Sequence, residues 1–155
     1  MRFANRALFR TKRFRRGGTA TLEMALTMLL LANICYGTIE FGYYFFVKNT
    51  VIGASREGCR ASIVAGAVYS DITTAVNSSL QAAGLSIGQF TTTVQVTHSG
   101  GSAQTINNLS TCVAGDTMSV TVSANWGTVG SGFRPMGLIG ANKVVTASSV
   151  MRKEG

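Results

Sequence analysis

The chain has 155 residues and a net charge of +8, which is room for one domain. Seven of its fourteen basic residues fall in the first sixteen positions with no acid among them, and the remaining chain carries seven basic residues against six acids. A nucleic-acid-binding domain needs its basic residues on a folded face, whereas a basic tail beside an apolar segment indicates a topology signal or an anionic-lipid contact. The charge distribution therefore argues against nucleic acid as a partner.

A long apolar stretch follows this basic leader. Residues 22–47 read LEMALTMLLLANICYGTIEFGYYFFV, in which sixteen residues without a charge separate Glu23 from Glu40. A helix over residues 24–47 would be about 36 Å long, enough to cross a hydrocarbon core of about 30 Å. The pattern predicts one membrane-spanning helix with the leader in the cytoplasm and the remaining chain outside. The aromatic residues 43–46 would form an outer interfacial belt or pack as ordinary helix residues.

Other targeting segments fit this stretch less well. A cleaved secretory signal has an apolar core of about 7 to 15 residues followed by a small-x-small site, and this core is longer. An organelle transit peptide does not normally run straight into a membrane-length apolar stretch. A lipoprotein signal would place small residues just before its cysteine, but Asn33 and Ile34 precede Cys35. An uncleaved or differently cleaved membrane anchor is the better interpretation.

The junction between the leader and the helix has a distinctive order. Residues 15–23 read RRGGTATLE, and this order of basic leader, glycine, four residues and glutamate resembles the prepilin peptidase signal. The resemblance implies cleavage after Gly18, so that Thr19 becomes the mature N-terminus and Glu23 the fifth mature residue. In type IV pilins this glutamate pairs with the free amine of a mature N-terminus. Carried over, Glu23 would pair with the Thr19 amine and help to set subunit register.

The carboxylate of Glu23 is informative without the resemblance. An ionised carboxylate at mid-bilayer costs about 2.5–3.5 kcal/mol on insertion scales, and less near the interface, so such residues usually have a partner and a function. A milder interpretation is that an acid suits the first turn of a helix, where the helix dipole is positive. The residues alone leave both interpretations open.

Two further elements extend the pattern. Ile39-Glu40-Phe41-Gly42 lies within the apolar stretch, and residues 54–61 read ASREGCRA. With the junction before them, these elements resemble the TadE-like family of minor pseudopilins from tight-adherence pili. The resemblance is strong over residues 13–65, faint at residues 145–154 and absent between. It implies a role in subunit assembly for Glu40 as well as Glu23, with Glu40 either at the outer interface or facing another subunit.

The resemblance implies a structural or assembly component of a Tad or type IVb-type pilus, and not an enzyme. The expected partners are prepilin peptidase, other pilins and pseudopilins, the pilus assembly machinery and the lipid bilayer, and no cofactor is implied. The protein would be held in the bacterial inner membrane by a single pass, with its C-terminal domain periplasmic or extracellular. Whether it enters the filament or stays at its base is left open.

The chain has three cysteines, Cys35, Cys59 and Cys112. Cys35 falls within the predicted membrane helix and is interpreted as a small apolar side chain. Outside the cytoplasm thiols can oxidise, so Cys59 and Cys112 are candidates for a disulfide that joins the helix to the outer domain. Closing a loop of about fifty residues would stabilise the fold by roughly 4 kcal/mol in the chain-entropy model.

The remaining chain predicts a small α+β domain. The first helix should continue to about residue 65, and a second helix should cover residues 70–83. Alternating and β-branched residues predict strands at residues 90–97, 117–126 and 143–150, with Gly- and Ser-rich loops over 99–115 and 127–140. We expect a helix packed on a small, mainly antiparallel sheet. The predicted organisation is a cleaved leader (1–18), a membrane-spanning and extended helix (19–65) and an extracytoplasmic domain (66–155).

No catalytic or metal-binding pattern emerges from the outer domain. His98 lies beside Ser99 and two glycines, which indicates an exposed loop and not a catalytic base. Histidine, cysteine and acidic residues are scattered instead of clustered as a metal site requires. The alternative function is an uncleaved, signal-anchored envelope protein whose outer domain binds a ligand or catalyses a reaction.

Overall fold

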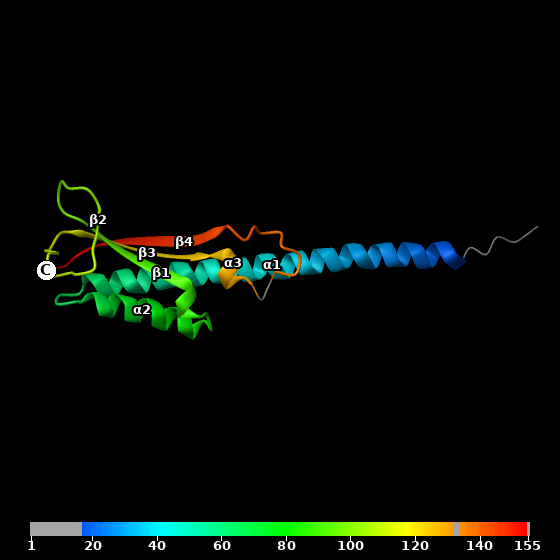
Figure 1. The fold of residues 1–155 in the computed structure, drawn as a ribbon, viewed down its shortest axis with the longest axis horizontal. Coiled ribbons are helices and arrows are strands. Elements are labelled where there is room, and N and C mark those ends of the chain that lie inside the picture. Colours follow the sequence, from blue (N-terminus) through cyan, green and yellow to red (C-terminus); the bar gives the residue numbers. More distant parts are fainter. Residues whose placement is uncertain (1–16, 132–133, 155) are drawn as a thin grey trace, which may run out of the picture. The chain divides into compact units, whose positions relative to one another are not determined.

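The computed structural model describes residues 17–131 and 134–154, so most of the predicted leader lies outside the described residues. The elements in chain order are α1 (Gly17–Ile63), α2 (Tyr69–Ala82), the short 3-10 helix η1 (Ile87–Gln89), β1 (Phe90–Thr97), β2 (Gln104–Thr105), β3 (Thr117–Asn125), α3 (Trp126–Val129) and β4 (Val144–Arg152) (Figure 1). The fold is α+β, with a long apolar N-terminal helix, a small second helix and a four-stranded antiparallel sheet, as the sequence predicts.

Helix α1 passes through two compact units, which are described separately. The first unit ends at Cys35 and the second begins at Tyr36. Within the described residues, α1 is the one helix that is long and apolar enough, by length and composition, to cross a membrane. The glycines at positions 53 and 58 do not interrupt it.

The sheet of the second unit has the strand order β2-β1-β3-β4, with every neighbouring pair antiparallel. Strand β3 is central, and its residues alternate between buried and half-buried along its length because successive side chains point to opposite faces. Met118, Val120, Val122 and Ala124 face the core, as their period-two spacing predicts. The opposite face is formed largely of serine and threonine side chains.

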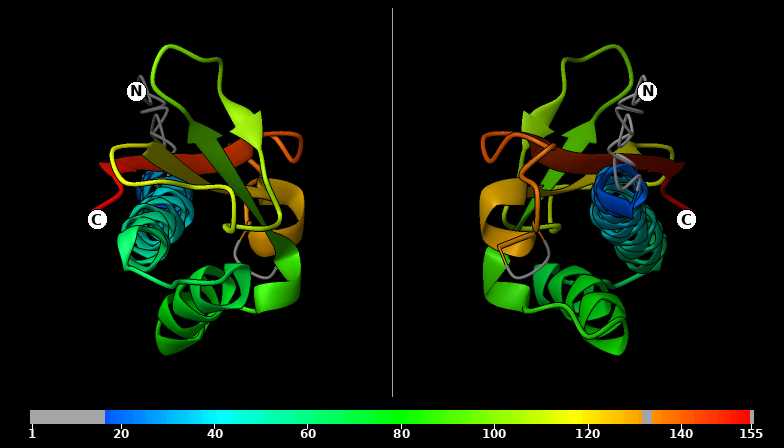
Figure 2. Two further views of the ribbon diagram at one scale, coloured as in Figure 1. Left: turned by 90° about the vertical axis from the view of Figure 1, so that its left-hand side faces the viewer. Right: turned by 90° about the vertical axis from the view of Figure 1, so that its right-hand side faces the viewer.

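Helices cover one face of this sheet (Figure 2). The part of α1 within the second unit contributes Val47, Val51 and Ala54 to the buried core, and α2 contributes residues at every fourth position, Ile72, Val76 and Leu80. This spacing places the side chains of α2 on one stripe, which is the pattern of an amphipathic helix. Asp71 starts α2 by accepting a hydrogen bond from the Val68 N–H at 3.0 Å.

Most predicted boundaries agree with the structure to within two residues. The first helix ends at Ile63 and α2 begins at Tyr69, while β1 covers the predicted residues. Three short elements were not predicted. The 3-10 helix η1 precedes β1, β2 lies inside the expected loop over 99–115, and α3 begins at Trp126, where the second predicted strand (117–126) was expected to end. His98 is the first residue after β1 and so lies in the predicted loop, but its side chain is half-buried instead of fully exposed.

Candidate functional site

The residues predicted for processing lie at the start of α1. Helix α1 begins at Gly17, so the Gly18–Thr19 bond lies in its first turn, where backbone N–H groups have no partner within the helix. A Cβ atom added at Gly18 would meet nothing within 4 Å. Glu23 is exposed, and its backbone carbonyl accepts a hydrogen bond from the Thr27 hydroxyl at 2.9 Å. Thr19 and Glu23 are four residues apart and therefore lie on the same side of the helix.

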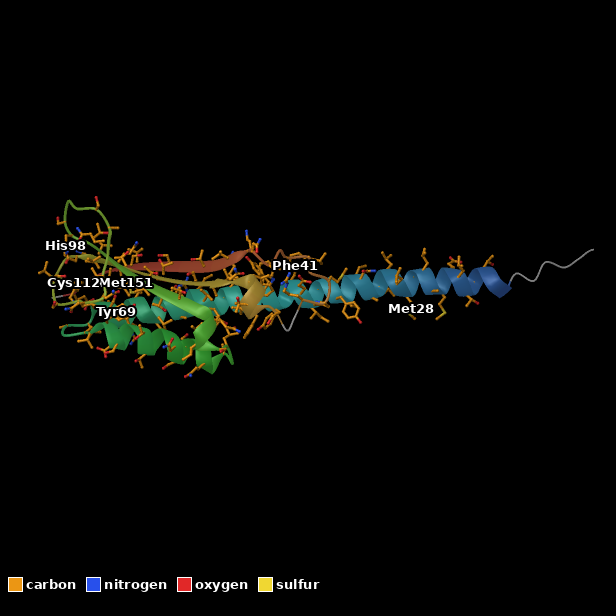
Figure 3. All side chains as sticks on the ribbon, in the orientation of Figure 1. Met28, Phe41, Tyr69, His98, Cys112 and Met151 are labelled. Carbon is orange, nitrogen blue, oxygen red and sulfur yellow. The ribbon has the colours of Figure 1, made fainter. Side chains whose placement is uncertain are left out.

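The first unit exposes apolar side chains on all sides of α1. Each large apolar side chain from Leu22 to Ile34 is more than half exposed. Figure 3 shows Met28 and its neighbours projecting outward from this stretch. A helix that is apolar all round is one that lipid or other protein covers. Glu23 is the one charged residue among positions 17–35.

The second acid of the helix, Glu40, is fully buried in the second unit. Its Oε1 accepts a hydrogen bond from the backbone N–H of Ile139 at 2.9 Å, and its Oε2 accepts one from Met136 at 3.3 Å. Both donors belong to the segment between α3 and β4. Hydrogen bonds to an ionised acceptor are stronger than neutral ones, so two peptide groups partly replace the water that the carboxylate loses.

The same segment also lies close to Gly37 on α1. A Cβ atom at this position would lie 3.4 Å from Cδ1 of Leu138, which is van der Waals contact. Glu40 and Gly37 are three residues apart and share one side of the helix. The two hydrogen bonds of Glu40 hold residues 136–139 against α1, and they join positions nearly one hundred residues apart in sequence.

The aromatic residues after Glu40 divide into two groups. Tyr43 and Tyr44 are half-buried, and their ring centroids lie 5.8 Å and 5.1 Å from that of the buried Trp126. Phe45 and Phe46 remain exposed. The two tyrosines therefore pack in the core of the second unit, which favours ordinary helix packing for them over an interfacial belt.

The ASREGCRA stretch places its small residues inward and its charges outward. Ala54, Ser55, Gly58 and Cys59 are buried, whereas Arg56, Glu57 and Arg60 are exposed. A Cβ atom at Gly58 would lie 2.5 Å from Cγ2 of Val76 on α2 and 3.2 Å from Cγ1 of Val120 on β3. This side of α1 consequently lies closer to α2 and the sheet than a larger side chain would allow.

Comparison with known proteins finds a family match for most of helix α1. Residues 18–60 match the family model of TadE-like proteins. The match confirms the resemblance that the sequence showed at the junction, at Glu40 and at the ASREGCRA stretch, and it points to a Tad pilus-associated protein. No curated protein and no solved structure matches the chain.

The TadE-like segment carries two of the three cysteines, and all three are free thiols in this structure. Cys59 is fully buried, and its thiol donates to the Met118 carbonyl with an Sγ–O distance of 3.5 Å. Cys112 is half-buried outside the TadE-like segment, and burial raises the pKa of its thiol above the ordinary value of 9.0, as does the nearby Asp116 carboxylate. The predicted pairing of Cys59 with Cys112 stays a prediction.

His98 and Asp116 form a polar pair beyond the TadE-like segment. His98 Nδ1 lies 2.8 Å from Asp116 Oδ2, which also accepts a hydrogen bond from the Val113 N–H at 2.8 Å. Asp116 is 2% exposed. The pair joins the end of β1 to the turn before β3, and so closes the long loop that contains β2. Among the described residues there is no group of three or more histidine, cysteine or acidic side chains that could hold a metal ion.

The contact of Glu40 with residues 136–139 and the role of Trp126 were not predicted. Residues 134–140 read RPMGLIG, and their apolar content is unusual for a connection predicted to be a solvated loop. That composition was the available signal that this segment packs against another element. Its hydrogen bonds to Glu40 come from backbone N–H groups, which every residue except proline carries.

Proposed function

We propose that this protein is a minor pseudopilin-like component of a Tad or type IVb-type pilus. Prepilin peptidase cuts between Gly18 and Thr19, and α1 then holds the protein in the inner membrane with the second unit outside. The observation that carries the proposal is an exposed, predominantly apolar helical segment whose one acid, Glu23, stands five residues after Gly18. The TadE-like match over the same residues supports it.

Cleavage would change the charge next to Glu23. Before the cut the Thr19 nitrogen is an uncharged amide, and afterwards it is an ammonium group one helical turn from the Glu23 carboxylate. The new cation can pair with Glu23 in the same chain or in a neighbouring one. Pairing lowers the cost of keeping a carboxylate in an apolar environment. Processing would thus prepare the segment for packing against other subunits.

The buried position of Glu40 supports a shorter membrane span than residues 24–47. Because Glu40, Tyr44 and Val47 face the core of the second unit, lipid would surround α1 only between Thr19 and Ile39. These 21 residues form about 32 Å of helix, close to the hydrocarbon thickness of about 30 Å. The basic leader would then lie on the cytoplasmic side.

The test is the N-terminus of the membrane-bound protein. In wild-type cells, we expect N-terminal sequencing to begin at Thr19, and cells without prepilin peptidase should accumulate the longer form. Gly18→Val should block processing, whereas the matched variant Gly17→Val should leave it intact. An intact Gly18–Thr19 bond in protein from wild-type cells would refute processing and favour an uncleaved signal anchor.

A further inference from the structure

The second unit carries its own group of exposed apolar side chains, at the start of its part of α1 and on the segment that Glu40 binds. We call this group the apolar collar, and it consists of Tyr36, Ile39 and Phe41 on α1 with Met136 and Leu138 from the segment before β4. Their exposed fractions are 51%, 48%, 46%, 38% and 52% respectively. All five residues belong to one compact unit.

The hydrogen bonds of Glu40 fix the place of the segment over residues 136–139 in the collar. The two carboxylate oxygens of Glu40 accept the N–H groups of Met136 and Ile139, so the backbone on both sides of Leu138 is held against α1. Leu138 lies beside Gly37 on the helix surface, where an added Cβ atom would be 3.4 Å from its Cδ1. A buried carboxylate therefore fixes the backbone of a segment whose side chains Met136 and Leu138 are exposed.

The positions of the collar residues indicate what covers them. At 100° per residue, Ile39, Tyr36 and Phe41 are spread over about 200° of the helix circumference, and the segment with Leu138 lies within that arc. This arc is wider than the apolar stripe of about 100° by which a helix packs on one protein face, and so it favours a bilayer interface, which contacts a helix from many directions. In sequence, the α1 residues of the collar directly follow the apolar stretch that ends at Ile34.

Charge in this region fits an anionic lipid surface. The acid nearest to the collar, Glu40, is fully buried and accepts two backbone hydrogen bonds. No acid occurs between Asp116 and Glu154, and the basic residues Arg134 and Lys143 lie on either side of residues 136–139 in sequence. Basic side chains near an apolar insertion add an attraction to anionic headgroups, which falls off within a Debye length. Aromatic and apolar side chains of this kind also suit the boundary between headgroups and acyl chains.

We infer that the apolar collar inserts into the outer boundary between lipid headgroups and acyl chains and so fixes the second unit on the membrane surface. This inference rests on the proposed membrane anchoring by α1. It assigns Met136 and Leu138 a lipid-binding surface at the outer end of the span between Thr19 and Ile39. Glu40 acts as a positioning residue for that surface.

The experiment measures depth with nitroxide labels on the full chain in phosphatidylcholine–phosphatidylglycerol vesicles. Cys35→Ala and Cys112→Ser remove the accessible native thiols and leave the buried Cys59. A single label at Leu138→Cys then tests the collar. A label at Met28→Cys is the reference for the membrane span, and a label at Val113→Cys is the reference for the exposed surface. Met136→Cys replaces Leu138→Cys if that variant unfolds.

The expected result is that labels at 138 and 28 collide more with oxygen than with a water-soluble nickel chelate, and that the label at 113 does the reverse. A label at 138 that behaves like that at 113, while 28 stays in lipid, overturns the collar and leaves the membrane span standing. Protection of 138 from both reagents means that another protein covers it, which also overturns lipid as the occupant. Water exposure at 28 refutes the anchoring itself.

Discussion

Gly58 is the position where the packing of the TadE-like segment can be tested most directly. An added Cβ atom would lie 2.5 Å from Val76 Cγ2, 3.2 Å from Val120 Cγ1 and 3.5 Å from Ile72 Cγ2. All three neighbours are at most 1% exposed, so they are packed on their other sides as well. Gly58→Ala therefore forces α1 away from α2 and β3, or forces buried side chains out of their rotamers.

The expected magnitude follows from two opposing effects. Overpacking of a buried site costs about 1–3 kcal/mol, whereas replacing glycine by alanine inside a helix gains up to about 1 kcal/mol. Gly53→Ala is the matched control, because it lies on the same helix and its added Cβ would meet nothing within 4 Å. The difference between the two variants removes the helix-propensity gain, and we expect Gly58→Ala to be less stable by about 1–3 kcal/mol.

Trp126 provides the assay. It is the one tryptophan of the chain and is buried in the core, so its fluorescence reports unfolding of the second unit. Thermal unfolding of the full chain in detergent should give a lower Tm for Gly58→Ala than for Gly53→Ala, by about 4 °C for each kcal/mol. Adding Val76→Ala to Gly58→Ala should recover part of the loss, because it removes the closest contact. Equal Tm values for the two single variants would show that the close approach at Gly58 is wrong.

Further predictions concern Glu40 and the cysteines. Glu40→Gln should raise the rate of hydrogen exchange at the Ile139 amide by about tenfold or more, because the charged acceptor is lost. The control Glu57→Gln changes an exposed glutamate of the same helix and should leave this rate unchanged. Equal exchange rates in the two variants would contradict the role of Glu40. Burial raises the pKa of the Cys112 thiol above 9.0, so its contribution to the free energy of unfolding should be complete below pH 9 and be lost as pH rises through the folded-state pKa. Above pH 9, the free energy of unfolding should therefore fall less steeply with pH in Cys112→Ser than in the wild type. Parallel profiles of the two proteins against pH would contradict this. If Cys59 and Cys112 form the predicted disulfide, mass spectrometry of the unreduced protein will show one free thiol, at Cys35, and two further free thiols would exclude it.

The elements that the sequence predicts well are those with a strong local period. The alternation of Met118, Val120 and Val122 identifies β3 because a strand with one buried face must repeat every two residues. The two-residue strand β2 has no such period, since it depends on pairing with Gln95 and Val96 and not on its own residues. Helix α3 was missed for the same reason, because four residues are too few to show a helical repeat.

The outer membrane boundary is where the local sequence is ambiguous. Lipid and a protein core both favour apolar side chains, so the sequence predicts one span over residues 24–47, and Val47 at its end is buried in the core of the second unit. The processing residues Gly18, Thr19 and Glu23 could be proposed because their signal is their order along the chain. The partners of Glu40 could not, because peptide N–H groups nearly one hundred residues away leave no residue-specific pattern.

The two acids on α1 illustrate how one residue type in one apolar helix can have different roles. Glu40 is buried and has its charge compensated by Met136 and Ile139 of its own chain, so a neutral substitute there should disturb the collar segment. Glu23 is exposed within an apolar segment, and the proposed function gives it a cationic partner only after cleavage at Thr19. Glu23→Gln should therefore leave Tm and processing unchanged but reduce co-purification with other pilus subunits, whereas Glu40→Gln should lower Tm. If Glu23→Gln assembles as well as the wild type while Gly18→Val blocks both processing and assembly, then cleavage serves a purpose other than pairing this carboxylate.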